Sequence, residues 1–328
     1  MKINKFFIGL GSLFFICAVI FARDSIFPSD KHSPSHSLSS QGLIFFHIPK
    51  CGGTTVDAPL RKYFNIKEDY PYSNFHLNYD SPEKNKILLK EHPYVAGHIF
   101  LKDLVEINQG IYRKPIITVM RSPVPRLISF LRYLKQRAIS PIPLDGTPFE
   151  KHLSTRFPNY YKMMMLLRDH PLTDEKMLKK ILDSNMREED AHVSEAMHLP
   201  VVALLVSQGK ISTNGLLWSI GIFPKKGQQI DEKFVDKVVD FAASNIDIIL
   251  FIDEEEPPLL DQMSALLKMD LEKKKERSLN VTESTPQNPP IDLEKNPKLK
   301  DFLYEQCKWD LMFYRKLKEK IRSNHKNL

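Results

Sequence analysis

A continuous apolar stretch that runs directly into a pair of glycines limits the fold of this chain more than any other feature: residues 43–55 read LIFFHIPKCGGTT. The apolar run Gly42–Ile48 predicts a strand buried on both faces, as in a parallel sheet. The runs Lys114–Met120 and Asn245–Ile252 have the same character. A turn and a helix signal follow these apolar runs in the sequence. We therefore expect one α/β domain over residues 42–328, with a central parallel sheet flanked by helices.

The turn after the first strand predicts an anion-binding site. Gly52 and Gly53 allow the backbone to turn sharply and to approach a ligand closely. The helix that opens here points its first N–H groups at the ligand, Lys50 adds a positive charge, and Thr54 and Thr55 add hydroxyl donors. Loops that bind nucleoside triphosphates place their lysine after the last glycine. Since Lys50 precedes the glycines, a triphosphate site is disfavoured, and a plain structural turn is the alternative.

A second cluster, RSPVPRLISFLRY, follows the second strand. We expect Arg121 to end that strand, Ser122 to cap the next helix and Pro123 to take its first position. Arg121 would then project beyond the carboxyl edge of the sheet, where open α/β sheets bind ligands. Arg121 and Ser129 could hold a second phosphate, although this arginine taken alone could equally be structural. The residues that share one face of the helix by their spacing are Ser122, Arg126, Ser129 and Tyr133.

Together the two clusters resemble the membrane-bound carbohydrate sulfotransferases, most closely the heparan sulfate 2-O- and 6-O-sulfotransferase group. HIPKCGGTT is similar to their 5′-phosphosulfate loop and RSPVPRLIS to their 3′-phosphate motif. YVAGHIFLKDL is similar to the segment with the catalytic histidine, which places that role on His98. LNVTEST and CKWDLMFYRKL resemble the cofactor-contacting loop, where Ser278 and Ser284 are the candidates, and the terminal helix. The resemblance covers roughly residues 42–317, and residues 140–240 match poorly.

Three positions depart from the pattern of this family. Cys51 stands where the family often has threonine, which removes one good donor. Pro59 follows the loop closely and costs a helical hydrogen bond unless it lies within the first turn. Ser122 replaces the more usual aspartate or asparagine, but serine still caps a helix. None of the three abolishes the predicted site.

The resemblance implies a P-loop-like sulfotransferase fold and transfer of a sulfuryl group from 3′-phosphoadenosine 5′-phosphosulfate (PAPS) to a carbohydrate hydroxyl, without a metal. Lys50 and the helix amides would stabilise the leaving phosphate, and His98 would act as general base. The other candidates for the base are His76, His92 and Glu91. Two alternatives remain: a nucleotide kinase or NTPase of similar fold, and a membrane-anchored glycan-binding protein with a degenerate site.

The formal charge of +7 and the pI near 9.0 favour an anionic ligand, such as an acidic glycan or the cofactor itself. The basic end of the chain lacks the interleaved aromatic residues typical of a nucleic-acid interface, so we expect no nucleic-acid partner. His192 and His198 have poor spacing for metal ligands on a helix. His47 is interpreted as a buried core histidine of the first strand.

Residues 1–22 combine basic residues with an apolar run and predict an uncleaved signal anchor, with a cleaved signal peptide as the alternative. Residues 23–41 are rich in Ser, Pro and His and predict a flexible stem. The charge flanking the apolar run predicts a cytosolic N-terminus. The domain would then face the Golgi lumen in a eukaryote, as in a type II membrane protein, or lie outside the inner membrane in a bacterium. The three cysteines are too few for a disulfide framework.

Overall fold

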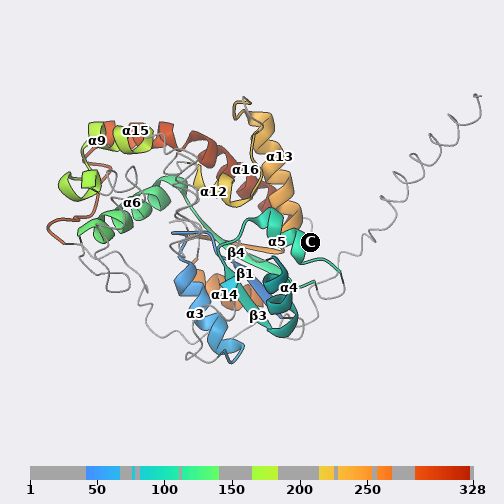
Figure 1. Ribbon diagram of the computed structural model, residues 1–328. Coiled ribbons are helices and arrows are strands. Elements are labelled where there is room, and N and C mark those ends of the chain that lie inside the picture. The colour runs from blue at the N-terminus through green and yellow to red at the C-terminus, as the bar shows by residue number, and fades with distance from the viewer. Residues whose placement is uncertain are drawn as a thin grey trace, which may run out of the picture. The chain divides into compact units, whose positions relative to one another are not determined.

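The computed structural model of this chain describes residues 42–66, 76–77, 82–110, 113–139, 165–183, 214–224, 228–252, 257–267 and 285–325. Within these residues, five parallel strands form one sheet in the order β2-β3-β1-β4-β5. Figure 1 shows this sheet between helices on both of its faces. The strands are β1 (Leu43–Phe46), β2 (His76–Leu77), β3 (Tyr94–Gly97), β4 (Ile116–Arg121) and β5 (Ile248–Ile252).

Strand β1 lies in the middle of the sheet and is buried along its whole length. Phe45 pairs with Ala96 of β3 on one side and with Ile117 of β4 on the other. Successive side chains of a strand point to opposite faces. Leu43 and Phe45 therefore contribute to the core on one face of the sheet, whereas their neighbours in the strand contribute to the core on the other.

Two helices cover the first of these faces. They are α3 (Gly53–Tyr63), which follows β1, and α14 (Leu259–Leu267), which follows β5. Figure 1 shows them together below the sheet. The core on this side is formed by Phe45, Val56, Leu60, Leu260 and Met263, among others. The hydroxyl of Tyr94 in β3 donates a hydrogen bond of 2.6 Å to Asp57, which also pairs with Arg61, so polar contacts fix α3 against the sheet as well.

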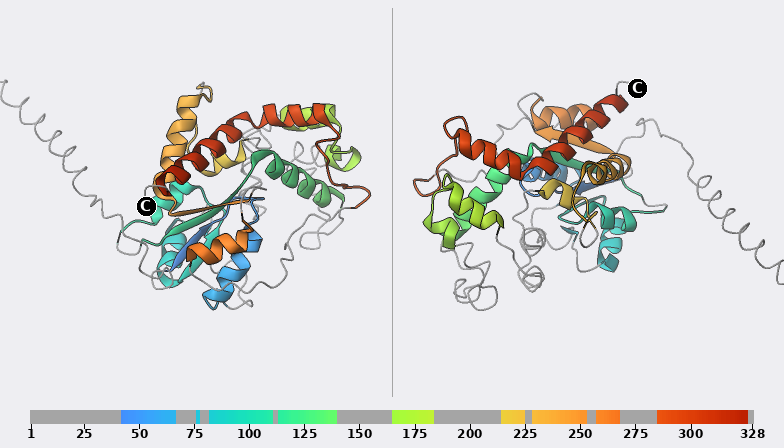
Figure 2. Two further views of the ribbon diagram at one scale, coloured as in Figure 1. Left: turned by 180° about the vertical axis from the view of Figure 1, so that it is seen from behind. Right: turned by 90° about the horizontal axis from the view of Figure 1, so that it is seen from above.

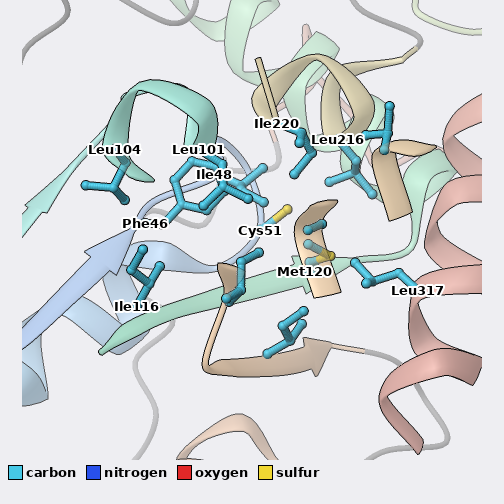
Figure 3. Close-up of a cluster of buried hydrophobic side chains, with 14 of the residues drawn as sticks. Phe46, Ile48, Cys51, Leu101, Leu104, Ile116, Met120, Leu216, Ile220 and Leu317 are labelled. Carbon is cyan, nitrogen blue, oxygen red and sulfur yellow. The ribbon is translucent and has the colours of Figure 1, made fainter. Parts of the chain in front are cut away.

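The opposite face of the sheet packs against a larger set of helices and carries the more extensive core. Figure 2 shows α13 and α16 crossing above the sheet, and Figure 3 shows the packed side chains between β1, β4, α5, α12 and α16. Lys316 and Lys320 of α16 form ion pairs with acidic residues of α13. The helices are α4 (Pro82–Glu91), α5 (Leu101–Ile107), α12 (Gly215–Ser219), α13 (Glu232–Asn245) and α16 (Lys308–His325).

A second layer of helices packs beyond the carboxyl end of β4. It consists of α6 (Pro123–Ile139), α9 (Glu175–Asp183) and α15 (Pro297–Gln306), which share their own hydrophobic core. Lys135 of α6 is buried there and donates hydrogen bonds of 2.6 and 2.7 Å to the carbonyl oxygens of Leu167 and His170. The positive charge thus satisfies carbonyl groups at the end of the helical segment 165–169.

The prediction of a central parallel sheet flanked by helices is confirmed, but two details are wrong. The first strand ends at Phe46, two residues earlier than predicted. The sequence LKDFLYEQCKWDLMFYRKLKEKIR, residues 299–322, predicts one closing helix, whereas the chain after residue 297 forms two helices that meet at Cys307. The chain bends where the two helices meet, because α15 packs with the helical layer and α16 packs on the sheet.

The predicted anchor and stem, residues 1–41, lie outside the described residues. Among the residues that are described, no helix is both long and apolar enough to span a membrane. The boundaries of the predicted domain therefore stay predictions. The sequence of residues 149–205 predicts mostly helix; of these the structure describes residues 165–183, in which 165–169 and α9 are helical.

Candidate functional site

The predicted site residues meet at the carboxyl edge of the sheet. The turn with Lys50 follows β1, His98 directly follows β3, and Arg121 is the last residue of β4. Because β1 lies between β3 and β4, the turn lies between the other two residues. This edge is where open α/β sheets bind their ligands. Strand order alone therefore places the turn that the sequence predicts to bind an anion between a histidine and an arginine.

The turn itself has an unusual backbone. Lys50 has a φ of 65° and Gly52 a φ of 73°, in the left-handed region that L-residues other than glycine seldom adopt. Such a conformation at a lysine costs roughly 1–3 kcal/mol and is typical of functional sites. At Gly52 a Cβ atom would also lie 2.5 Å from Cδ1 of Ile252, so the end of that side chain would have to move.

The helix α3 begins at Gly53, as the sequence predicts, and Gly52 is its N-cap without a side-chain cap. The N–H of Thr55 bonds to the carbonyl oxygen of Gly52 at 3.0 Å. The partial positive charge of the helix end is thus not offset by an acidic residue, since none lies in the first turn. Thr54 and Thr55 are half-buried in this first turn.

Two positive side chains converge beside the turn. Burial, and then the charge of Arg121, lower the pKa of Lys50 from 10.5 to about 8. Burial likewise lowers the pKa of Arg121. The ammonium of Lys50 lies 4.5 Å from the ring centroid of Tyr133 on α6, an attractive cation–π geometry. A half-buried pair of like charges favours an anion between them.

His98 is held in one tautomer. Its Nδ1 lies 2.7 Å from the carbonyl oxygen of His47. A carbonyl can only accept, so Nδ1 carries the hydrogen and the basic lone pair of the neutral ring is on Nε2. This is the arrangement that a general base requires. The interaction joins the end of β3 to the residue that enters the turn.

His47 belongs to this site and is not the core histidine that the sequence predicts. It follows β1 and is half-buried. Its ring lies 4.2 Å from that of His98 and stacks on Phe45 at 5.2 Å. The ring also covers Gly53, where a Cβ atom would lie 1.9 Å from Nε2 of His47. The apolar run continues through Ile48 in the sequence, so nothing in the pattern indicates that the strand ends before His47.

Arg126 has a structural role that the sequence does not reveal. It is 2% exposed and forms an ion pair of 3.5 Å with Asp310, which is 0% exposed. Asp310 also accepts hydrogen bonds of 2.9 Å from the N–H groups of Leu216 and Leu217. Burial raises the pKa of Asp310 to about 6, against the opposing effect of Arg126. Helical spacing placed Arg126 with Ser129 and Tyr133, but its partner is 184 residues away.

Of the remaining candidate residues, one lies on α6, some lie far from the turn, and some are not described. Ser129 is half-buried on α6, which begins directly after Ser122. Ser278 and Ser284 lie outside the described residues, as do His192 and His198. His92 and Glu91 precede β3 and so lie at the opposite edge of the sheet from Lys50. His76 is in β2, and its side chain is not among those described.

Two of the departures from the sulfotransferase pattern can be judged from the structure. Cys51 is fully buried within the core shown in Figure 3, and burial raises the pKa of its thiol to about 11. It therefore acts as a core residue and not as a ligand donor. Pro59 lies in the second turn of α3, so the helix lacks the hydrogen bond that an N–H there would donate. Cys51 and Cys307 are both free and buried.

Comparisons with known proteins do not identify the chemistry of this site. A scan against protein-family models, a search of curated proteins and a search of solved structures find no significant match to this chain. Within the described part of the chain, no group of three or more His, Cys, Asp or Glu side chains is placed to hold a metal ion. The site is thus defined by its cations, its helix terminus and its histidines.

Proposed function

We propose that this chain is a PAPS-dependent sulfotransferase with a P-loop-like sulfotransferase fold that acts on a carbohydrate hydroxyl. One observation carries the proposal: the turn with Lys50 lies between His98 and Arg121 at the carboxyl edge of the sheet. Group transfer needs an anion-binding centre next to a base, and this arrangement supplies both. The resemblance of the motifs to sulfotransferases gives the reaction its identity.

The donor groups suit a ligand with phosphate groups at two points. Lys50 and the first turn of α3 offer a positive charge, N–H groups and threonine hydroxyls at one point. Arg121, at the end of the neighbouring strand, offers a guanidinium at the other, with Ser129 in the helix that follows. The mutual repulsion of the two cations would be relieved by such a ligand. PAPS fits this donor set, with its 5′-phosphosulfate at Lys50 and its 3′-phosphate at Arg121.

Each residue has a defined task in the proposed reaction. PAPS supplies the sulfuryl group, and such transfers proceed through a loose, in-line transition state. Lys50 and the amides of α3 stabilise the negative charge that develops on the leaving phosphate. His98 accepts the hydroxyl proton of the acceptor at Nε2, while its Nδ1–H stays bonded to His47. The imidazolium that forms is stabilised by this carbonyl contact.

Calorimetric binding of 3′-phosphoadenosine 5′-phosphate (PAP), against ATP, tests the proposal on the purified full-length protein. We expect micromolar binding of PAP, no comparable binding of ATP, and loss of PAP binding in Arg121→Ala. Arg113→Ala is the matched control, because Arg113 precedes the same strand at its other end and pairs with Asp247 at the surface. PAP binding should survive that change.

The outcome also separates the two alternatives. Preferential binding of ATP would favour a nucleotide kinase or NTPase. Absence of nucleotide binding in a folded protein that still binds polysaccharide would favour a glycan-binding protein. The membrane anchor, the stem and the Golgi-lumenal or bacterial inner-membrane location are proposed from residues 1–41 alone.

A further inference from the structure

Three aromatic rings form a cluster close to the candidate base. Phe223 lies 5.3 Å from Phe100 in an edge-to-face contact and 5.0 Å from Trp218 in a stacked one. Phe223 is 38% exposed, and the other two rings are half-buried. We call these three residues the aromatic platform. Their rings contact one another, yet part of this apolar surface faces solvent.

The platform is anchored to the end of β3. Phe100 is two residues after His98, so the two Cα atoms are within about 7 Å of each other. The segment with Trp218 and Phe223 is tied to the same place, because the N–H of Lys102 bonds to the carbonyl oxygen of Ile220 at 3.0 Å. At Gly221, with a φ of 79°, a Cβ atom would lie 2.7 Å from Cβ of Phe100. Figure 3 shows Ile220 and Leu101, which are neighbours of these residues in the chain, within the hydrophobic core.

Strand order separates the platform from the second anion-binding point. Phe100 follows β3, whereas Arg121 ends β4, and β1 with its turn lies between these strands. A nucleotide that extends from Lys50 towards Arg121 therefore leads away from β3. Because His98 also follows β3, the molecule that gives its proton to His98 is placed nearer this strand than the nucleotide is. The platform is thus on the acceptor side of the site.

We propose that the aromatic platform binds a sugar ring of the acceptor by stacking. This inference rests on the proposed function, which makes the acceptor a carbohydrate. Aromatic faces carry a negative quadrupole, and one face of a pyranose ring presents polarised C–H groups that such a surface attracts. Stacking would orient the sugar while its hydroxyl groups stay available for His98. The platform deepens the proposed function by assigning a subsite that selects a ring with an apolar face.

The test uses the full-length protein with Trp309→Phe, which leaves Trp218 as the single tryptophan, since the chain has two. A heparosan hexasaccharide and the neutral cellohexaose are titrated, at up to millimolar concentration, while Trp218 emission is followed. We expect at least one of the two to change the emission. Phe223→Ala should weaken that binding about tenfold, the loss that follows from removing roughly 55 Å² of apolar contact. Phe223→Tyr should restore it.

Tyr304→Ala is the control, since Tyr304 is comparably exposed on α15, and it should leave the titration unchanged. PAP binding, measured in parallel, should be the same in Phe223→Ala as in the parent protein. A response to neither sugar in a protein that binds PAP would overturn the platform and leave the sulfotransferase proposal standing. A response to sugar in a protein that binds no PAP would support sugar binding by the platform, but it would overturn the sulfotransferase and with it the role of the platform in an acceptor site. Loss of PAP affinity in Phe223→Ala would assign the rings to the nucleotide and overturn the platform.

Discussion

The lowered pKa of Lys50 makes a quantitative prediction about anion binding. Because burial and Arg121 hold this pKa at about 8 instead of 10.5, the ammonium is present below about pH 8 and is lost above it. The protonated fraction falls from roughly 90% at pH 7 to roughly 10% at pH 9 for a pKa of about 8. A phosphate monoester, with a second pKa near 6, is already about 90% doubly ionised at pH 7, so its own charge changes little over this range. We therefore expect the affinity for PAP to fall about tenfold, or about 1.4 kcal/mol, between pH 7 and pH 9.

Calorimetry at constant ionic strength measures this slope, since screening by salt would otherwise change the affinity as well. Lys50→Arg is the informative variant, because a guanidinium stays charged over the whole range. It should bind PAP with little dependence on pH. Any slope that remains in this variant comes from other groups that titrate near pH 8, such as the α-amino group. A flat profile for the parent protein, or the same slope in Lys50→Arg, would refute the reasoning.

Three further predictions concern single side chains. His98→Asn should lower the rate of sulfuryl transfer by about 10²- to 10⁴-fold and leave the dissociation constant of PAP within about twofold; an equal loss of binding would contradict a role as base. Tyr94→Phe removes the hydrogen bond to Asp57, so urea unfolding should show a loss of about 2 kcal/mol, and no loss would mean that this bond does not fix α3. Gly53→Ala lies at the first position of α3, so it gains at most the roughly 1 kcal/mol of helix propensity found in helix interiors, and its Cβ atom collides with the ring of His47; we expect a lower melting temperature, and a higher one would show that the ring moves aside at little cost.

The sequence pattern predicts those parts of the fold that depend on local order. The apolar runs of β1, β4 and β5 and the glycine turn are contiguous in the chain, so periodicity and turn chemistry suffice to find them. The position of Arg121 at the end of β4 follows from the same pattern. The two-residue strand β2 is too short to produce any periodic signal. These elements place the candidate site before any side-chain contact is known.

What the pattern misses depends on partners that are distant in the chain. Arg126 is a buried half of an ion pair because Asp310 is brought to it by the packing of α16, and no local signal indicates that partner. His47 lies in the site because it contacts His98, which follows a different strand. Phe223 is recognised as part of the aromatic platform only once the structure shows its ring in contact with that of Phe100. Such contacts arise from tertiary packing and cannot be deduced from the spacing of residues.

The register of the sheet also has a consequence for the synthesis of this chain. Ile117 of β4 pairs with Ile248 of β5, a partner that is 131 residues further along (248 minus 117). Strands β1, β3 and β4 can associate once residue 121 has left the ribosome, but the outer edge of β4 stays unpaired until β5 has left it too. At translation rates of about 5–20 residues per second, the wait is roughly 7–26 seconds. During that time an apolar strand, IITVMR, offers unpaired N–H and C=O groups to any other chain. A ribosome that stalls between these two strands would therefore release a fragment with a strong tendency to aggregate.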